Sequence, residues 1–368
     1  MTPTLSILFI EKFKFMSLNL NLQFLLTALF IICFMFSILI NYIMLRFAQT
    51  LGVRGRNENE VRWNPEVKPS LGGISFYLVF LVAFIFAVLL PHRQDGFNIQ
   101  VVGILLAATL SFLMGLADDA FNTQPLLKFL TQIFCGLIVI ISGLSIQIFE
   151  NQFLNYFLTV LWVVGMMNSL NMLDNMDGIA TIVSIVACFF VVMLNLATSN
   201  TTGYPTVLSL GVLGALAGFL VYNFHPAKMF MGDTGSQFLG LFLAVMGISH
   251  GWNTPTTVWV GGIPFSNFLI IALVFMLPLC DTVTVVINRL RSGNSPFVGG
   301  KDHTTHHLYF KGLNEKKIAI LFFVLGSVAI FMAYLMVMRF SMIVFYVSLF
   351  YFLIVFVALY LNTILKKK

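Results

Sequence analysis

Long apolar segments separated by short polar loops dominate this chain. A transmembrane helix needs about 20 predominantly apolar residues, and about eleven segments come close to that length. Their apolar residues are continuous rather than alternating, which favours helices over the strands of a membrane barrel. The pattern therefore predicts an all-α polytopic membrane protein. The expected spans are residues 22–46, 71–90, 99–116, 126–144, 153–170, 178–197, 205–222, 235–249, 266–287, 318–338 and 341–363.

Composition supports this class and excludes a soluble domain. Hydrophobic residues make up 59% of the 368 residues and charged residues only 9%, whereas soluble domains have about 25% charged residues. The four cysteines lie in apolar segments without a CxxC pair, so we expect buried thiols rather than disulfides or metal ligands. We expect an N-terminal extracytoplasmic segment (1–21), one transmembrane domain (22–363) and a basic cytoplasmic tail (364–368).

The basic residues predict the orientation of the chain. With the N-terminus outside, all but four of the 20 Lys and Arg fall in inner loops or at inner ends of spans. The four exceptions are Lys12, Lys14, Arg93 and Arg339. Because Lys and Arg collect in cytoplasmic loops, we predict an outside N-terminus and a cytoplasmic C-terminus.

The aspartates gather on the same predicted side, and only Asp95 is expected outside. A general preference of Asp for loops does not explain why the outer loops nearly lack it. Since neither the spans nor the orientation depends on these acids, their convergence points to a shared site. The inner aspartates are Asp118, Asp119, Asp174, Asp177, Asp233, Asp281 and Asp302.

Adjacent carboxylates, Asp118 and Asp119, end the third expected span. Two such charges about 4 Å apart repel by roughly 4 kcal/mol at an effective dielectric constant near 20. A divalent cation, or a nearby Lys such as Lys128, would relieve this repulsion. The alternative is a solvated helix end, and the pair alone does not decide between the two.

Polar residues recur every three positions at Asn168, Asn171, Asp174 and Asp177. On a helix this spacing forms a slowly drifting stripe on one face, and a polar stripe at the end of a membrane helix is expected to line a cavity. Carboxylate and carboxamide oxygens are suitable ligands for Mg²⁺. Helix capping is the alternative, but capping needs one such residue and not four.

A glycine-containing segment, Phe230 to Ser236, precedes the eighth expected span. Its glycines permit close approach of the backbone to a ligand, and its last amides could meet a phosphate at a helix N-terminus. Asp233 could hold a metal beside that phosphate, and Phe230 could stack on a nucleobase. A Gly-rich turn capped by Asp is the alternative.

Three histidines, His303, His306 and His307, lie in the longest inner loop, close to Arg289 and Lys301. The absence of an HExxH pattern and of a nearby cysteine argues against zinc. Contact with phosphate is the functional interpretation, and a solvated basic loop is the alternative.

Taken in chain order, these motifs resemble the polyprenyl-phosphate N-acetylhexosamine-1-phosphate transferase superfamily, glycosyltransferase family 4. Each motif is common alone, but their order on one predicted side is specific. The matching positions are Lys68 to Gly73, Asp118–Asp119 with Lys128 and Gln132, Asn168 to Gly178, Asn223, Phe230 to Ser236, Asp281–Thr282 and His303 to His307.

The resemblance implies an enzyme that transfers a sugar-1-phosphate from a UDP-sugar to a lipid phosphate and releases UMP, with residues 22–363 as its catalytic domain. It implies that Asp118 deprotonates the lipid phosphate, and that Asp119, Asn171 and Asp233 lie at Mg²⁺, or Mn²⁺ in its place. The implied substrate contacts are Lys68 and Lys128 to phosphate, Asp174 and Asp177 to the nucleoside, Phe230 to uracil, His303, His306 and His307 to the diphosphate or sugar, and Asn168 and Asn223 within the same pocket.

The interrupted set His303-x-x-His306-His307 is similar to the branch that transfers N-acetylglucosamine-1-phosphate to undecaprenyl phosphate for cell-envelope polysaccharides. The peptidoglycan branch, which takes UDP-MurNAc-pentapeptide, usually has ten spans and three consecutive histidines. Asn175 and Met176 depart from the family, which often has Gly and a branched aliphatic residue there. A secondary transporter is the alternative from another class, but transport sites lie near the membrane midplane and these acids lie at one surface.

These resemblances imply a UDP-N-acetylhexosamine donor and a polyprenyl-phosphate acceptor, with no nucleic acid partner. We expect a multi-pass protein of the bacterial inner membrane whose active site opens on the cytoplasmic face. The sequence leaves open whether the protein forms a homodimer.

Overall fold

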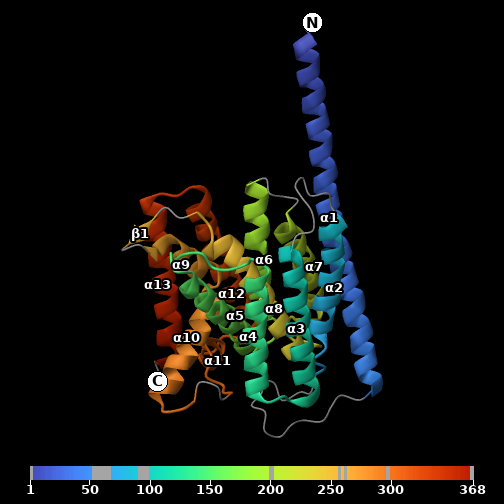
Figure 1. The fold of residues 1–368 in the computed structure, drawn as a ribbon. Helices are drawn as coiled ribbons and strands as arrows, with labels where there is room; N and C mark the ends of the chain where they lie inside the picture. Colours follow the sequence, from blue (N-terminus) through green and yellow to red (C-terminus); the bar gives the residue numbers. More distant parts are fainter. Residues whose placement is uncertain are drawn as a thin grey trace.

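The computed structural model describes residues 3–51, 68–89, 99–198, 203–255, 258–260, 263–295 and 299–364. Its helices stand side by side in a bundle, and the start of α1 extends beyond one end of that bundle (Figure 1). The longer helices are α1 (Pro3–Leu51), α2 (Gly72–Leu89), α3 (Ile99–Phe121), α4 (Pro125–Ile141), α5 (Gln152–Leu173), α6 (Ile179–Ala197), α7 (Tyr204–Asn223), α8 (Gly232–Gly247), α10 (Met276–Arg291), α12 (Glu315–Met338) and α13 (Met342–Ile364). The shorter elements are η1 (Ile248–Trp252), α9 (Phe265–Val274), α11 (Thr304–Phe310) and the two strands β1 (Trp259–Val260) and β2 (Ile263–Pro264).

Every predicted span coincides with a helix or with the pair α9–α10, which confirms the helical membrane class. Within the described ranges, eight helices are long and apolar enough to cross a membrane, or nine if α9 and α10 form one span. Helices α4 and α8 are shorter, with 17 and 16 residues. The expected number of eleven spans is therefore not confirmed, and the orientation stays a prediction.

The helix pair α9–α10 bends by 90° at Phe275, within the single span that the sequence predicts over residues 266–287. Pro278 explains the position of the break. Its nitrogen carries no hydrogen and cannot bond to the carbonyl of Val274, and its ring would clash with that carbonyl in a continuous helix. Pro278 instead occupies the first turn of a new helix, where it is tolerated.

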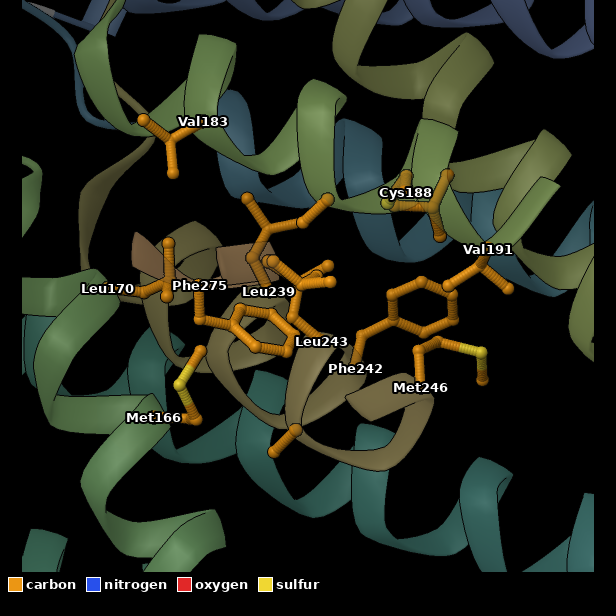
Figure 2. Packing of buried hydrophobic residues seen from close by; sticks show 14 of the residues in the cluster. Met166, Leu170, Val183, Cys188, Val191, Leu239, Phe242, Leu243, Met246 and Phe275 are labelled. Carbon is orange, nitrogen blue, oxygen red and sulfur yellow. The ribbon is translucent and has the colours of Figure 1, made fainter. Parts of the chain in front are cut away.

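Helix α8 lies in the interior of the bundle, and all its residues from Thr234 to Gly247 are buried. In the most apolar 18-residue window of α6, 78% of the residues are buried inside the protein, whereas in that of α13 only 22% are buried. Helix α13 therefore presents most of its side chains to lipid. Side chains of α5, α6 and α8 interdigitate around Phe275 (Figure 2). This packing holds the second half of α8 inside the bundle.

Two local features complete the fold. Strands β1 and β2 form a short antiparallel pair that the sequence does not predict. The four cysteines are buried free thiols, as predicted.

Several predicted features lie outside the described residues. They include the tail residues 365–368, Asp95, and the basic residues Arg54, Arg56, Arg62 and Arg93. The end of α3, the start of α4 and helices α10 and α11 lie at the same end of the bundle (Figure 1).

Candidate active site

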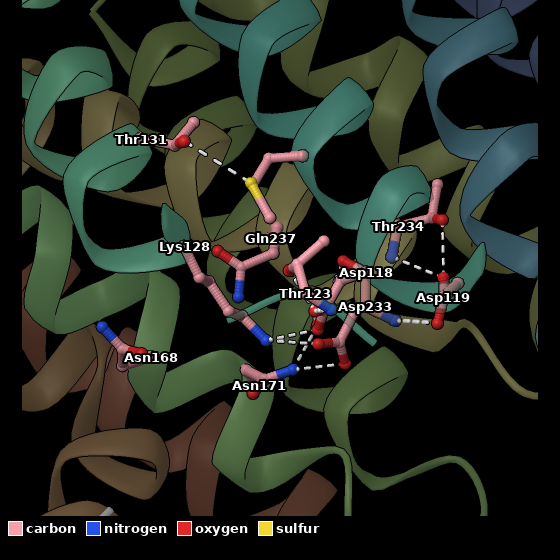
Figure 3. Close-up of polar contacts among 12 residues, drawn as sticks. Asp118, Asp119, Thr123, Lys128, Thr131, Asn168, Asn171, Asp233, Thr234 and Gln237 are labelled. Carbon is pink, nitrogen blue, oxygen red and sulfur yellow. Dashed lines mark hydrogen bonds and ion pairs between the residues drawn. The ribbon is translucent and has the colours of Figure 1, made fainter. Parts of the chain in front are cut away.

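Four polar side chains from four helices meet at the end of the bundle where α3 ends and α4 starts (Figure 3). The Lys128 ammonium of α4 lies 3.1 Å from Oδ2 of Asp118 on α3 and also contacts Oδ2 of Asp233 on α8. Asn171 of α5 donates through Nδ2 to Oδ1 of Asp233 at 2.8 Å. The structure thus brings together residues that are far apart in the sequence and were predicted to share one site.

The turn between α3 and α4 positions Asp118 against Lys128. Asn122 has a φ of 53°, a left-handed conformation that Asn tolerates better than most residues, and its N–H donates to the Asp118 carbonyl at 2.8 Å. The Thr123 N–H donates to Oδ1 of Asp118 at 2.9 Å. Pro125 then starts α4, so Lys128 lies within its first turn. The Lys128 contact relieves the carboxylate repulsion expected at Asp118.

Asp119 points to the first turn of α8. Its Oδ1 accepts a hydrogen bond from the Asp233 N–H at 2.9 Å, and its Oδ2 accepts from the N–H and hydroxyl of Thr234 at 2.8 and 2.6 Å. Gly232, with a φ of +70°, has no Cβ; an added one would lie 2.5 Å from Oδ2 of Asp119. Gly115 on α3 similarly lies against the backbone of Asp233. Asp119 therefore fixes the backbone that positions the Asp233 side chain.

A buried network of amides lies beside the acidic residues. Asn168 donates to Gln132 Oε1 at 2.7 Å, and Gln132 donates to Gln237 Oε1 at 3.0 Å. These contacts link α4, α5 and α8. Asn168, predicted to contact substrate, thus holds three helices of the site in register.

Lys68 and Phe230 lie together at the edge of the site. The Lys68 ammonium is 5.6 Å from the centre of the Phe230 ring, within the range of a cation–π contact. Their segments pair as a parallel bridge between Ser70 and Phe230, and the Gly72 N–H donates to the Phe230 carbonyl at 3.1 Å. A ring and a positive charge predicted to meet uracil and phosphate therefore form one surface.

Two further predicted residues hold loops together. Buried Asn223 accepts from Thr181 at 2.7 Å and donates to the Met229 carbonyl at 3.0 Å. Asp177, 3% exposed, accepts from the Ala227 N–H at 2.9 Å. These contacts tie the start of α6 to the segment that leads to Asp233. Their roles toward substrate stay predictions.

Helix α10 holds the histidine segment through two carboxylate contacts. Fully buried Asp281 accepts from the Thr304 N–H at 2.8 Å through Oδ1, and its Oδ2 lies 2.7 Å from Nδ1 of His303. Two turns further along α10, Arg289 donates to both oxygens of Asp302 at 2.7 and 2.8 Å. The Arg289 guanidinium keeps the pKa of the Asp302 carboxyl below its usual range, although partial burial opposes this shift. Three consecutive residues, 302–304, are therefore fixed.

The histidine segment also contacts the loop that follows α5. The Thr305 hydroxyl donates to Oδ1 of Asn175 at 2.7 Å. Asn175 adjoins Asp174, so the histidines lie beside the predicted nucleoside-contacting loop. Asn175, one of the two residues that depart from the common family pattern, is therefore hydrogen-bonded to the histidine segment.

His306 is expected to make the stability of the protein depend on pH. Burial, and next the positive charge of His303, lower its pKa from 6.5 to about 4. Below about pH 6.5 the unfolded chain therefore binds a proton that the folded protein does not, and stability falls as the pH is lowered. Between pH 7.5 and pH 5 we expect a loss on the order of 1–2 kcal/mol from this group.

Thermal unfolding in detergent at several pH values tests this expectation. The fall in Tm between pH 7.5 and pH 5 should be smaller for His306→Gln than for the unchanged protein. Equal falls in both proteins would show that His306 does not contribute.

Burial and the neighbouring carboxylates both act on the carboxyl group of Asp174. Enclosure of its carboxyl group, and then the negative charges of Asp233, Asp119 and Asp177, raise its pKa to about 8. A divalent cation would reduce this repulsion. Asp233 and the carboxamide of Asn171 supply the hard oxygen donors that Mg²⁺ prefers, so these residues fit such an ion.

Sequence patterns did not reveal several residues that shape the site. Thr123 and Gln237 each make a contact described above, but each is a single polar residue in a common setting. Ser236 was noted as part of its motif, but its acceptance of a 2.9 Å hydrogen bond from Asn171 was not expected. Only the spatial arrangement distinguishes these residues from ordinary polar positions.

Comparison with known proteins agrees with this geometry. The family model described as glycosyl transferase family 4 matches residues 101–251, which include Asp118, Asn171 and Asp233. A probable undecaprenyl-phosphate N-acetylglucosaminyl 1-phosphate transferase of Bacillus subtilis is 25% identical over 308 residues, which cover 81% of each chain. The decaprenyl-phosphate N-acetylglucosaminephosphotransferase of Mycobacterium leprae is 28% identical over 295 residues, or 74% of each chain.

A third relative represents another branch. The phospho-N-acetylmuramoyl-pentapeptide-transferase of Limosilactobacillus reuteri is 25% identical over 284 residues, which cover 72% of this chain and 82% of the relative. The fold, the site and these similarities define the protein as a multi-pass membrane enzyme of the phosphoglycosyl transferase class. The resemblance predicted from the motifs is confirmed as a similarity: the model of glycosyl transferase family 4 matches residues 101–251, and the relatives above match most of the chain.

Proposed function

We propose that this enzyme transfers N-acetylglucosamine-1-phosphate, or a related N-acetylhexosamine-1-phosphate, from a UDP-sugar to undecaprenyl phosphate and releases UMP. The reaction would be the first membrane step of a cell-envelope polysaccharide. The names of the Bacillus and Mycobacterium relatives support the sugar and the type of acceptor. The strongest structural support is the cluster of Asp118, Lys128, Asn171 and Asp233 at one end of the bundle.

The location of this cluster suits a reaction between a water-soluble donor and a lipid. A polyprenyl phosphate keeps its phosphate at headgroup level, and UDP-sugars are cytoplasmic. We therefore assign the cluster to the cytoplasmic face, in agreement with the distribution of basic residues in the sequence.

In this proposal Asp233 and Asn171 would hold Mg²⁺, or Mn²⁺ in its place. Asp119 lies on the same side of the site as the ion, because it accepts a hydrogen bond from the backbone N–H of Asp233. When bound, the ion neutralises the donor diphosphate and stabilises the charge on departing UMP. The carboxylates of Asp119 and Asp233 are held by backbone and side-chain donors, so little rearrangement is needed before the reaction.

Asp118 accepts the proton of the lipid phosphate, which makes that phosphate a better nucleophile. A lipid-phosphate oxygen then attacks the phosphorus bonded to the sugar, and the bond from this phosphorus to the bridging oxygen breaks as UMP leaves. Lys128 lies between Asp118 and Asp233 and counters the charge of the two approaching anions. A two-step route, in which an Asp first attacks the same phosphorus to give a covalent phosphosugar enzyme, is the competing mechanism.

The donor would extend from the acidic residues toward two surfaces. The Phe230 ring and Lys68 offer a stacking surface and a positive charge to the uridine part of the donor. The histidine segment, held by Asp281 and next to Asn175, offers contacts to the diphosphate or sugar.

The competing substrate is UDP-MurNAc-pentapeptide, because one group of relatives is named for that transfer. The interrupted histidine set favours N-acetylglucosamine. Membranes containing the enzyme should release UMP and form a labelled lipid from labelled UDP-N-acetylglucosamine and undecaprenyl phosphate. Product from UDP-MurNAc-pentapeptide alone would instead assign the peptidoglycan branch, and no lipid product from either donor would refute the proposal.

Asp281 is expected to position His303 for this reaction. Asp281→Asn removes the negative acceptor that fixes the ring and should lower kcat by about 10- to 100-fold, the usual loss for a partner that orients a functional histidine. The measurement is kcat as a function of pH, because altered orientation of His303 should shift the profile, whereas a loss of folded enzyme only lowers its height. The matched variant Asp302→Asn, at a carboxylate 32% exposed, should have a smaller effect.

A further inference from the structure

A second group of charged residues lies where three segments meet, apart from the cluster of Asp118 and Asp233. Asp177 follows α5, His225 follows α7, and Glu315 is the first residue of α12. The His225 Nδ1 atom lies 2.9 Å from Asp177 Oδ2 and 3.0 Å from Glu315 Oε2. One oxygen from each acid and the ring nitrogen all lie within 4.8 Å of one another.

The surroundings fix these three side chains in place. Asp177 also accepts from the Ala227 N–H at 2.9 Å, which orients its carboxylate. Asn314 caps α12 by accepting from the Lys317 N–H at 2.9 Å, so the first turn that contains Glu315 is well defined. The side chain of Asp177 is 3% exposed and that of Glu315 is 12% exposed, whereas His225 is 31% exposed.

A single imidazole nitrogen cannot serve both carboxylates equally well. A ring N–H points in one direction, and only the contact with Asp177 has hydrogen-bond geometry, whereas Glu315 lies at ion-pair distance. A metal ion between the three atoms would bind all of them at once. Bonds of about 2.1 Å in a tetrahedral site place neighbouring donor atoms about 3.4 Å apart, so both His225 distances, 2.9 and 3.0 Å, need to lengthen by only about half an ångström to admit the ion.

The donor types indicate which ion would bind. One imidazole nitrogen with two carboxylate oxygens suits Zn²⁺ and similar transition-metal ions, whereas Mg²⁺ and Ca²⁺ prefer oxygen donors only. The backbone N–H of Ala227 donates a hydrogen bond to the Asp177 carboxylate. Hydrogen bonds of this kind orient the ligands of a metal ion.

We propose that Asp177, His225 and Glu315 form a structural site for a transition-metal ion of the Zn²⁺ type. The site joins the start of α12 to the loops after α5 and α7. Because α12 directly follows the histidine segment of α11, a bound ion holds that segment over the loop that contains Asn175. Asp177 then acts as a metal ligand instead of contacting the nucleoside. The inference does not depend on the proposed substrate.

The test is binding of Zn²⁺ to the purified full-length protein in detergent, after removal of metals with a chelator and in excess Mg²⁺. Isothermal titration calorimetry gives the number of Zn²⁺ ions bound per chain, and thermal unfolding gives the change in Tm. The variants are His225→Gln and Glu315→Gln, with Glu150→Gln as the matched control. Zn²⁺ that binds to His303, His306 or His307 gives the same background in all of these proteins.

The unchanged protein and Glu150→Gln should bind one more Zn²⁺ than His225→Gln or Glu315→Gln, and Zn²⁺ should raise Tm only in the first two. Equal binding and equal Tm changes in all four proteins would overturn the proposal, and would leave an ion-paired histidine as the explanation. If one variant fails to fold, the other still gives the comparison. UMP release is measured separately, so failure of this proposal differs from failure of the proposed function.

Discussion

Asp233→Asn is expected to lower kcat by about 1000-fold or more in the transfer of sugar-1-phosphate. Asp233 accepts a hydrogen bond from Asn171 through one carboxylate oxygen and contacts the Lys128 ammonium through the other. It is the predicted metal ligand that contacts both of these side chains. Removal of its charge weakens metal binding and the neutralisation of the diphosphate, effects that are together worth several kcal/mol. The measurement is UMP release by purified enzyme over a range of Mg²⁺ concentrations.

The control for Asp233→Asn is Glu150→Gln, which removes an exposed carboxylate just before the start of α5, at the opposite end of that helix from Asn171, and should keep normal turnover. Size-exclusion chromatography and Tm should show that both variants are folded. Near-normal turnover of folded Asp233→Asn, with an unchanged Mg²⁺ dependence, would refute the metal assignment.

Asp118→Asn is expected to lower kcat by about 100- to 10,000-fold, the range usual for loss of a general base. The Asn side chain keeps the shape of Asp118 but cannot take the proton of the lipid phosphate. It also leaves Lys128 with Asp233 as its remaining carboxylate partner of the two. The measurement is kcat at several pH values with undecaprenyl phosphate as acceptor.

The pH profile distinguishes a base from a structural residue at this position. If Asp118 acts as the base, activity of the variant should rise at higher pH, where the lipid phosphate loses its proton without help. A variant with the same profile as the unchanged enzyme and only slightly lower kcat would exclude Asp118 as the base. Thr123→Ala, which removes one donor to Asp118, should cause a smaller loss.

The helical class could be predicted from the sequence because long apolar runs have few alternatives in a membrane. The number of spans could not be predicted, since α4 is apolar but short and α8 has only 16 residues, and length alone does not show whether a helix crosses the bilayer. The bend between α9 and α10 interrupts a continuous apolar run. Pro278 was visible in the sequence, but a Pro in a membrane helix can also produce only a kink.

The candidate site was predictable to the extent that polar residues are rare in the spans. Asp118, Asn171 and Asp233 stand out for that reason, and the structure places them in contact. The direction in which each side chain points could not be predicted. Asp119 directly follows Asp118, but its side chain points to the backbone of α8. Adjacent residues on a helix point in different directions, so a motif identifies the site and not the role of each member.

Lys128 could be associated with the acidic pair because the turn at Pro125 is short. The contact between Thr305 and Asn175 could not be predicted, because 130 positions separate them. Such long-range pairs depend on how the helices pack, which one sequence does not specify.

Gly115 limits how this enzyme can be redesigned. A methyl group added there would lie 2.4 Å from the carbonyl oxygen of Asp233, too close for any real contact. Helices α3 and α8 would have to separate, and Asp118 and Asp233 are attached to opposite sides of that gap. Shifts near 1 Å can reduce turnover about 100-fold, so the absence of one carbon atom sets the spacing of the two acids.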